Sequence, residues 1–347
     1  MTAYRSDRRA ALPLPASGLA LAVGALAAAD RRRRKRHHAS LEPEDREVQN
    51  DLPGESCRIV SADGGDLFVT RSGPAQGAVV VLAHCWTGSR QTWAPVARRL
   101  VAAGCQVVRW DQRGHGRSIA GSRGYTIEAL ADDLAAIVTE LGVRRAVLAG
   151  HSMGGMTAQA FAGYHRELFD DRVTGLVLVS TAAAGVASVA LDRAAPVIGS
   201  AALERIAERP VIGMSVVRAS FGPWAYWNHL QLVSRNFIDT PRSVRTQFAE
   251  AMLHMDLRAD ITGIRVPTTI LVGTHDTLTP SPRARLMAEL IPSARLRLIG
   301  GVGHMLPLEN GGLVADAILA QVAREMIHDQ PIRSPTELPS TIQPVRL

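Results

Sequence analysis

The sequence predicts an α/β protein with a mainly parallel, doubly wound sheet and an inserted helical cap. Strand-like apolar runs alternate with helix-like segments over residues 55–180 and again over 257–328, which is typical of parallel strands with helices on both faces. Some runs, such as residues 78–83 (AVVVLA), are apolar throughout, as in strands buried on both faces. The alternation stops over residues 181–256, which predicts a helical cap inserted into this core.

The first half of the core is expected to open with a hairpin, because residues 57–61 and 66–71 flank the turn sequence Ala-Asp-Gly-Gly. Residues 127–141 have the apolar spacing of an amphipathic helix, with Asp132 and Asp133 expected on its polar side. The other expected elements are strands at 78–83, 106–110, before residue 150, and at 173–179, and a helix over 91–103.

The second half resumes the same rhythm after the cap. Strands are expected at residues 268–272 and 296–299, a helix between them near 282–290, and a closing helix over 313–327. Residues 329–347 are rich in proline and are expected to form an irregular, exposed tail.

Composition limits the possible functions. Hydrophobic residues make up 46% of the 347 residues and charged residues 20%, as in a globular protein that can bury one large core. The net charge of +7 lies entirely within residues 1–38, so the balanced body is not expected to bind nucleic acid. Lys35 is the only lysine, which excludes P-loop and Schiff-base chemistry in the body. The three cysteines have neither a metal-ligand nor a disulfide spacing, and no metal or cofactor is expected.

Residues 1–54 are interpreted as an apolar segment, a basic run and a linker. The apolar run 12–29 is near the minimum length for crossing a bilayer, and the basic run 31–36 follows it directly. As a membrane anchor, this segment would hold the body on the cytoplasmic side, because positive charge resists translocation. As an alternative, Arg8-Arg9 begins a twin-arginine export signal. A disordered extension without function is the third interpretation.

The stretch Gly150-His151-Ser152-Met153-Gly154 follows an apolar strand and precedes a helix-forming segment. A serine on so sharp a strand-to-helix turn has its hydroxyl exposed, as a nucleophile requires. The turn is so tight that side chains two positions before and after the serine would collide with each other. Gly150 and Gly154 remove those side chains. Ser152 is therefore the candidate nucleophile, and a glycine-rich turn that only packs helix on sheet is the structural alternative.

A serine hydroxyl needs a base, and the base needs an orienting acid. Asp276 follows the apolar run TTILVGT, and His304 lies in a glycine-rich loop after LRLIG. Both therefore fall just beyond expected strands, in the order serine, acid, histidine. A turn-capping aspartate and a loop histidine bonded only to backbone are the structural alternatives.

An acyl-transfer site also needs N–H donors for the oxyanion and a surface for the substrate. The expected donors are the N–H of Met153, after the nucleophile, and that of Trp86, with Cys85 as the alternative. Trp224, Tyr226 and Trp227, in the expected cap, are candidates for lining an apolar substrate pocket. Packing within the cap is the alternative for each of them.

Several stretches resemble the α/β-hydrolase superfamily, in particular its small capped esterases, monoacylglycerol-lipase-like proteins and cofactor-free haloperoxidase-like members. They are LAHCWTGSRQTW, WDQRGHGRS, GHSMGG, VGTHDTLTP and GGVGHMLPLE, spread over residues 55–327. The resemblance implies the α/β-hydrolase fold, with Ser152, Asp276 and His304 as triad and Trp86 and Met153 as oxyanion donors. It also implies that Asp111, Arg113 and Ser118 are scaffold residues. One departure is Cys85, where the family usually has glycine; a side chain there would narrow the oxyanion loop or change its backbone angles.

These residues predict a serine hydrolase that cleaves lipophilic carboxylic esters through an acyl-enzyme on Ser152. A C–C hydrolase, lactonase, perhydrolase or acyltransferase with the same triad remains open, because fold does not fix substrate. A non-catalytic binding module at the membrane is the alternative from another class. The expected partners are a small ester substrate and, through the N-terminal segment, a membrane.

Overall fold

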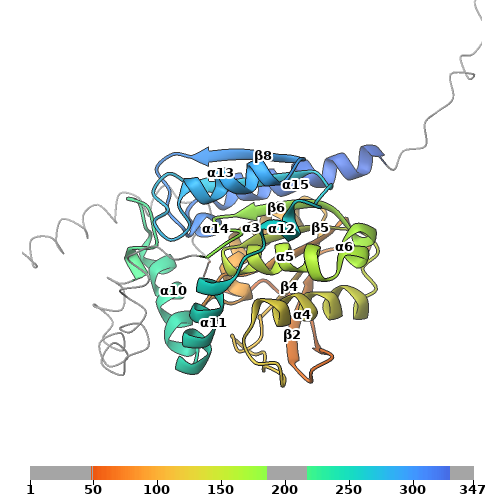
Figure 1. Cartoon of the computed structure of the whole chain (residues 1–347), viewed down its shortest axis with the longest axis horizontal. Helices are drawn as coiled ribbons and strands as arrows, with labels where there is room; N and C mark the ends of the chain where they lie inside the picture. Colours follow the sequence, from red (N-terminus) through yellow and green to blue (C-terminus); the bar gives the residue numbers. More distant parts are fainter. Residues whose placement is uncertain (1–47, 49, 186–216, 329–347) are drawn as a thin grey trace, which may run out of the picture.

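The computed structural model describes residue 48 and residues 50–185 and 217–328. These residues form a sheet in the order β1-β2-β4-β3-β5-β6-β7-β8 (Figure 1). The β1–β2 and β2–β4 pairs are antiparallel, and the pairs from β4 through β8 are parallel. The mainly parallel sheet predicted from the sequence is thus confirmed. The strands are β1 (Glu55–Val60), β2 (Asp66–Ser72), β3 (Val79–Ala83), β4 (Gln106–Trp110), β5 (Ala146–His151), β6 (Val173–Val179), β7 (Thr268–Gly273) and β8 (Ala294–Ile299).

Helices cover both faces of the sheet. Successive side chains of a strand point to opposite faces, and in the central strands both sets are apolar, so both faces must be buried. In β3, Val81 and Ala83 belong to the core cluster under α4 and α5, whereas Val80 and Leu82 belong to the cluster under α3 and α15. The helices of the core are α3 (Ala94–Ala102), α4 (Ile127–Glu140), α5 (Met153–Tyr164), α6 (Arg166–Arg172), α12 (Arg258–Ile261), α13 (Ser281–Leu290), α14 (Leu306–Glu309) and α15 (Gly311–His328).

The sequence missed short elements and displaced some strand ends, such as those of β1, which was expected at residues 57–61 and lies at Glu55–Val60. The helices α6, α12 and α14 were not expected, and a 3-10 turn, η1 (Arg90–Trp93), precedes α3. The last strand begins at Ala294 rather than at residue 296, because Ala294 pairs with Thr268 of β7. Elements of one or two turns have too few residues to establish a periodic pattern.

The expected position of Asp133 on the polar side of α4 is wrong. Its side chain is completely buried, and its two carboxylate oxygens accept hydrogen bonds from the Arg113 guanidinium at 2.6 and 2.7 Å. Arg113 is also fully buried and forms a second ion pair with Asp63 at 2.9 Å. A buried guanidinium needs carboxylate partners, so Asp133 faces inward although its neighbour Asp132 remains partly exposed.

Two further helices, α10 (Trp227–Asp239) and α11 (Arg242–His254), lie between β6 and β7 in the chain. Figure 1 shows them side by side at one end of the sheet. Phe248 of α11 contacts the rings of His115 and Tyr125, at centroid distances of 5.6 and 5.4 Å. The cap predicted over residues 181–256 includes residues 186–216, which lie outside the described residues, so its full extent stays a prediction.

The predictions for the apolar run, the basic run and the tail fall on residues 1–47 and 329–347, also outside the described residues. In the ranges that the structure does describe, no helix has the length and apolar character needed to cross a membrane. The end of the expected linker contacts the core, because the Asp51 carboxylate accepts hydrogen bonds from buried Arg109 at 3.1 Å and from Arg90 at 2.6 Å.

Candidate active site

Ser152 lies between β5 and α5 with φ 53° and ψ −117°. Non-glycine residues rarely adopt a positive φ, and this strained geometry is typical of a nucleophilic serine on a strand-to-helix turn. Three hydrogen bonds to the backbone of Ser152 hold the turn in place. The N–H of Ser152 donates to the carbonyl of Val179 at 2.9 Å, and its own carbonyl accepts from Gly155 N–H and from the Thr181 hydroxyl at 2.8 and 2.7 Å.

The predicted need for glycine at positions 150 and 154 is confirmed. A Cβ atom at Gly150 would lie 2.3 Å from the carbonyl oxygen of Gly154, and one at Gly154 would lie 2.2 Å from that of Ala83. Both contacts are with backbone, which has little room to yield. These glycines therefore let α5 approach β3 and β5 closely enough to form the turn that carries Ser152.

The structure brings Asp276 and His304 together. Asp276 follows β7, His304 follows β8, and both side chains are almost completely buried. Nδ1 of His304 lies 3.1 and 3.0 Å from the two carboxylate oxygens of Asp276. Because the carboxylate only accepts, Nδ1 carries the proton, and Nε2 is left with a lone pair for a base.

Asp276 is held in its ionised form. Burial would raise its pKa, but the adjacent His304 and hydrogen bonds from Thr279 outweigh burial and hold the pKa well below its usual range. Its oxygens also accept backbone N–H bonds from Leu278 at 3.0 Å and from Thr279 at 2.8 Å. An aspartate fixed as an anion can orient a histidine and stabilise its protonated form.

Thr279 is a residue of this site that the sequence analysis did not assign. Its hydroxyl donates to an Asp276 oxygen at 2.8 Å and lies 3.2 Å from Nδ1 of His304, and its side chain is buried. A signal was present in the segment Asp276-Thr-Leu-Thr, since aspartate and threonine side chains both bond nearby backbone in turns.

The serine and the histidine are not joined by a hydrogen bond in this structure. Within the described chain, the ring of His304 bonds only through Nδ1, to Asp276 and Thr279. Catalytic hydrogen bonds are often long in the free enzyme and shorten when substrate binds. The residue before the serine does bond to the histidine, because Nε2 of His151 donates to the His304 carbonyl at 2.8 Å.

The predicted oxyanion donors lie at the ends of two elements. Met153 is the first residue of α5, so its N–H has no acceptor within the helix. In the loop after β3, the N–H of Thr87 donates to Nε2 of His115 at 3.0 Å and that of Gly88 to the Cys85 carbonyl at 2.9 Å. No hydrogen bond among the described residues uses the Trp86 N–H. Its role as oxyanion donor stays a prediction.

Cys85 fits the loop without backbone strain. The positive φ of this loop falls on Thr87, at 54°, and not on Cys85. The Cys85 side chain is 5% exposed and packs in an apolar cluster with Phe221, Leu230 and Met305. Burial raises the pKa of its thiol to about 12. A thiol that stays protonated is a poor nucleophile, so Cys85 is a packing residue.

The aromatic residues expected to line a substrate pocket lie at the start of α10. Trp224 and Trp227 are 45% and 38% exposed, and the Tyr226 ring meets His229 edge-on at 5.3 Å. Phe221, three residues before Trp224 in the chain, is buried. Their contact with substrate stays a prediction. Trp86 also faces this element, since its ring lies edge-on to Phe237 of α10 at 6.4 Å.

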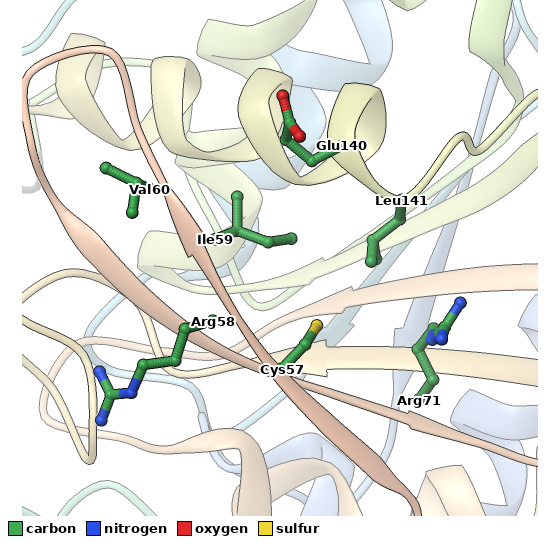
Figure 2. Close-up of a pocket in the computed structure, with 7 residues that line it drawn as sticks. All are labelled: Cys57, Arg58, Ile59, Val60, Arg71, Glu140 and Leu141. Carbon is green, nitrogen blue, oxygen red and sulfur yellow. The ribbon is translucent and has the colours of Figure 1, made fainter.

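A surface hollow of about 570 Å³ lies elsewhere on the molecule, beside edge strand β1 and the last turn of α4 (Figure 2). It includes Cys57, Arg71 and Glu140. Leu141, which also lines it, precedes β5, whereas Ser152 follows β5. The hollow is therefore at the opposite end of the strands from the serine.

Comparison with known proteins agrees with this architecture. A family model described as alpha/beta hydrolase fold matches residues 78–311. The chain is 26% identical to a non-heme haloperoxidase of Rhodococcus erythropolis over 274 residues, which are 76% of this chain and 97% of the relative. An esterase structure from Exiguobacterium antarcticum superimposes with a TM-score of 0.70 at 24% identity, covering 78% of this chain and 100% of the other. A thermophilic esterase structure from Thermogutta terrifontis gives 0.65 at 26% identity, covering 78% and 98%.

Proposed function

The chain belongs to the alpha/beta hydrolase fold family and is an enzyme of that superfamily. We propose that it is a serine hydrolase that cleaves carboxylic esters. The observation that carries the proposal is the pairing of His304 Nδ1 with the Asp276 carboxylate at 3.0 Å. The His304 backbone is in turn bonded to His151, the residue before a serine with a positive φ of 53°. A turn needed only for packing helix on sheet does not require a buried, ionised aspartate on a histidine. The preferred substrates are small to medium lipophilic esters.

In the proposed reaction, the Ser152 oxygen attacks the ester carbonyl while Nε2 of His304 takes its proton. The N–H groups of Met153 and Trp86 stabilise the negative charge that develops on the carbonyl oxygen. His304 then returns the proton to the leaving alcohol, and the acyl group remains on Ser152. A water molecule, deprotonated by His304 in the same way, releases the acid and restores the enzyme.

The proposal is tested with p-nitrophenyl esters of increasing acyl length and a fluorophosphonate probe, using the full chain. Wild type is expected to turn over the esters and to be labelled, and Ser152→Ala is expected to lose both. A matched control is Ser122→Ala, a serine whose hydroxyl bonds only the Asp63 carbonyl, at 3.2 Å, among the described residues. Equal labelling of wild type and Ser152→Ala would eliminate the acyl-enzyme.

A second candidate reaction is perhydrolysis on the same acyl-enzyme. It is favoured by the similarity to a non-heme haloperoxidase over 97% of that relative. In this reaction hydrogen peroxide replaces water in the second step, so the acyl group leaves Ser152 as a peracid and His304 takes the peroxide proton. Peracid formation from an ester and hydrogen peroxide would require Ser152. If no peracid forms while esters are hydrolysed normally, the enzyme is a hydrolase without perhydrolase activity.

The location of the enzyme is a separate proposal that depends on sequence alone. We propose that residues 12–29 anchor the chain in a membrane with the catalytic body on the cytoplasmic side, because the basic run 31–36 follows directly. Export through the twin-arginine pair Arg8-Arg9 is the alternative. Fractionation of cells that express the full chain separates the two. An uncleaved chain in the membrane fraction supports the anchor, and a shortened chain outside the cytoplasm supports export.

A further inference from the structure

Glu309, the last residue of α14, connects the loop that carries His304 to the segment that precedes α10. Its Oε2 atom accepts a hydrogen bond from the N–H of Gly222 at 2.7 Å. Both carboxylate oxygens also accept from the N–H of Gly303 at 3.0 Å, immediately before His304 in the chain. One carboxylate thus bonds two backbone groups that are far apart in sequence.

Backbone hydrogen bonds reinforce this connection. The N–H of His304 donates to the carbonyl of Ser220 at 2.8 Å, and the N–H of Met305 donates to the same carbonyl at 3.3 Å. We call Glu309, Gly303, Ser220 and Gly222 the Glu309 clamp. Through it, three successive backbone N–H groups, from residue 303 to residue 305, have acceptors that lie outside their own loop.

The two segments of the clamp are in backbone contact, which only glycine permits. A Cβ atom at Gly303 would lie 2.4 Å from the nitrogen of Gly222, and one at Gly222 would lie 2.7 Å from the carbonyl oxygen of Gly301. Neither contact is with a flexible side chain, so a methyl group at either position must push the segments apart.

The surroundings of Glu309 act on its protonation in both directions. Burial raises the pKa of Glu309 above its usual value and outweighs the opposite effect of the N–H bonds from Gly303 and Gly222 and of the nearby His304 and Arg218. The two N–H bonds are the contacts that favour the ionised form. An ionised acceptor makes shorter and stronger hydrogen bonds to N–H groups than a neutral one. Glu309 is half-buried, and the hydrogen bonds of its carboxyl group among the described residues go only to the backbone of Gly303 and Gly222. A carboxyl group bonded in this way is suited to holding the histidine loop.

We propose that Glu309 is a positioning residue that sets the place of His304 by fixing the backbone of Gly303 against Ser220 and Gly222. This inference rests on the proposed function, because it concerns the base of that reaction. Glu309 touches neither the ester nor the reacting atoms and acts through the histidine loop. A displacement of the base by about 1 Å is enough to cost about 100-fold in rate. The clamp also ties the segment before α10 to the base, so a movement of that segment would change catalysis.

The first test compares Glu309→Ala and Glu309→Gln with wild type, on the full chain, by ester kinetics and thermal unfolding. Glu309→Ala is expected to lower kcat about 10- to 100-fold and to change KM less than about 3-fold, because positioning acts on the chemical step. Glu309→Gln keeps one acceptor oxygen, so its kcat is expected to lie between those of wild type and Glu309→Ala. The control is Glu325→Gln, which removes another bonded carboxylate, paired with Arg145 and Thr174 far from His304, and is expected to keep kcat.

The second test opens the clamp without removing any charge. Gly222→Ala is expected to reproduce the loss in kcat, whereas Gly300→Ala, in the same loop as His304 but with no atom within 4 Å of the added methyl group, is expected to have wild-type kinetics. The double variant Glu309→Ala with Gly222→Ala is expected to lose no more than the worse single variant, because both changes break one clamp.

The proposal would be overturned if Glu309→Ala kept the wild-type kcat. It would also be overturned if the loss of kcat were fully explained by the fraction of unfolded protein, or if Glu325→Gln lost as much kcat. Additive losses in the double variant would also overturn it. Failure of the proposed function is recognised separately, because wild type itself would then not be labelled by a fluorophosphonate, and that result would overturn both proposals.

Discussion

Nε2 of His151 donates a hydrogen bond to the backbone carbonyl of His304 across 2.8 Å. Because the carbonyl only accepts, Nε2 carries the proton. Burial lowers the pKa of His151 to about 3, so near neutral pH the ring is neutral and its Nδ1 is unprotonated. That Nδ1 atom is buried and has no partner among the described residues. The residue before the nucleophile therefore bonds the carbonyl of the base, while Glu309 bonds the N–H of Gly303, the residue before the base.

Three buried histidines make the fold sensitive to acid. Burial lowers the pKa of His84 to about 4 and of His115 and His151 to about 3, from 6.5. Between these values and 6.5 the unfolded chain binds more protons, so the free energy of unfolding falls as the pH drops. Each histidine contributes a slope of up to about 1.4 kcal/mol per pH unit. Denaturant unfolding between about pH 7 and about pH 5 measures this slope.

His115→Gln tests whether the buried histidines cause this pH dependence. The glutamine oxygen can still accept the Thr87 N–H, but the glutamine side chain does not titrate. The slope is expected to decrease by the contribution of one histidine. His254→Gln, on an exposed side chain, is the control and should keep the wild-type slope. An unchanged slope in His115→Gln would contradict the assignment.

The identity of the acid is tested by two aspartates. Asp276→Asn is expected to lower kcat about 10³- to 10⁴-fold, because an amide cannot hold His304 in the required tautomer. Asp111→Asn is expected to lower the melting temperature and to keep most of kcat, because the carboxylate of Asp111 is buried and accepts from Arg90 and from the N–H of Arg117. Steady-state kinetics and thermal unfolding of both variants decide, and the opposite pattern would make Asp111 the acid.

The close approach of α5 to β3 is tested by Gly154→Ala. The added methyl group would lie 2.2 Å from the carbonyl oxygen of Ala83, so a loss of about 2 kcal/mol or more in unfolding free energy is expected, with loss of fluorophosphonate labelling. Gly312→Ala in α15, whose methyl group has no atom closer than 3.7 Å, is the matched control. Normal labelling of Gly154→Ala would show that the turn tolerates a side chain there.

The buried ion pair of Arg113 is expected to stabilise the fold. Asp133→Asn leaves a fully buried guanidinium with one partner fewer and is expected to cost about 3 kcal/mol of unfolding free energy. The neighbouring variant Asp132→Asn breaks partly exposed contacts with Arg123 and His165 and is expected to cost less than about 1 kcal/mol. Equal costs in denaturant unfolding would contradict the assignment of Arg113 as a buried scaffold residue.

Cys85 is expected to be dispensable for chemistry. Its buried thiol, with a pKa near 12, should not react with iodoacetamide in the folded enzyme. Cys85→Ala is expected to keep kcat within about 2-fold and to cost about 1 kcal/mol of stability. Inactivation of wild type by iodoacetamide that Cys85→Ala resists would instead assign the thiol a place in the reaction.

Much of the architecture followed from local patterns. Continuous apolar runs predicted the central strands, because a strand covered on both faces has no polar side. The sequence Gly-His-Ser-Met-Gly predicted the turn at Ser152, because a Cβ atom at Gly150 would collide with Gly154, only four positions away in the chain. Asp133 shows the limit of such patterns, since helical periodicity placed it toward solvent whereas the buried Arg113 holds it inside.

What the sequence by itself determined is the succession of strands and helices and the order of Ser152, Asp276 and His304 along it, because alternating polarity and tight turns depend on chain neighbours. Only the tertiary structure decided which atoms meet across long separations. The bond from His151 to His304 spans 153 residues and that from Gly222 to Glu309 spans 87. Such contacts depend on how the parallel strands and their crossovers pack in three dimensions, and residue type alone does not specify this packing.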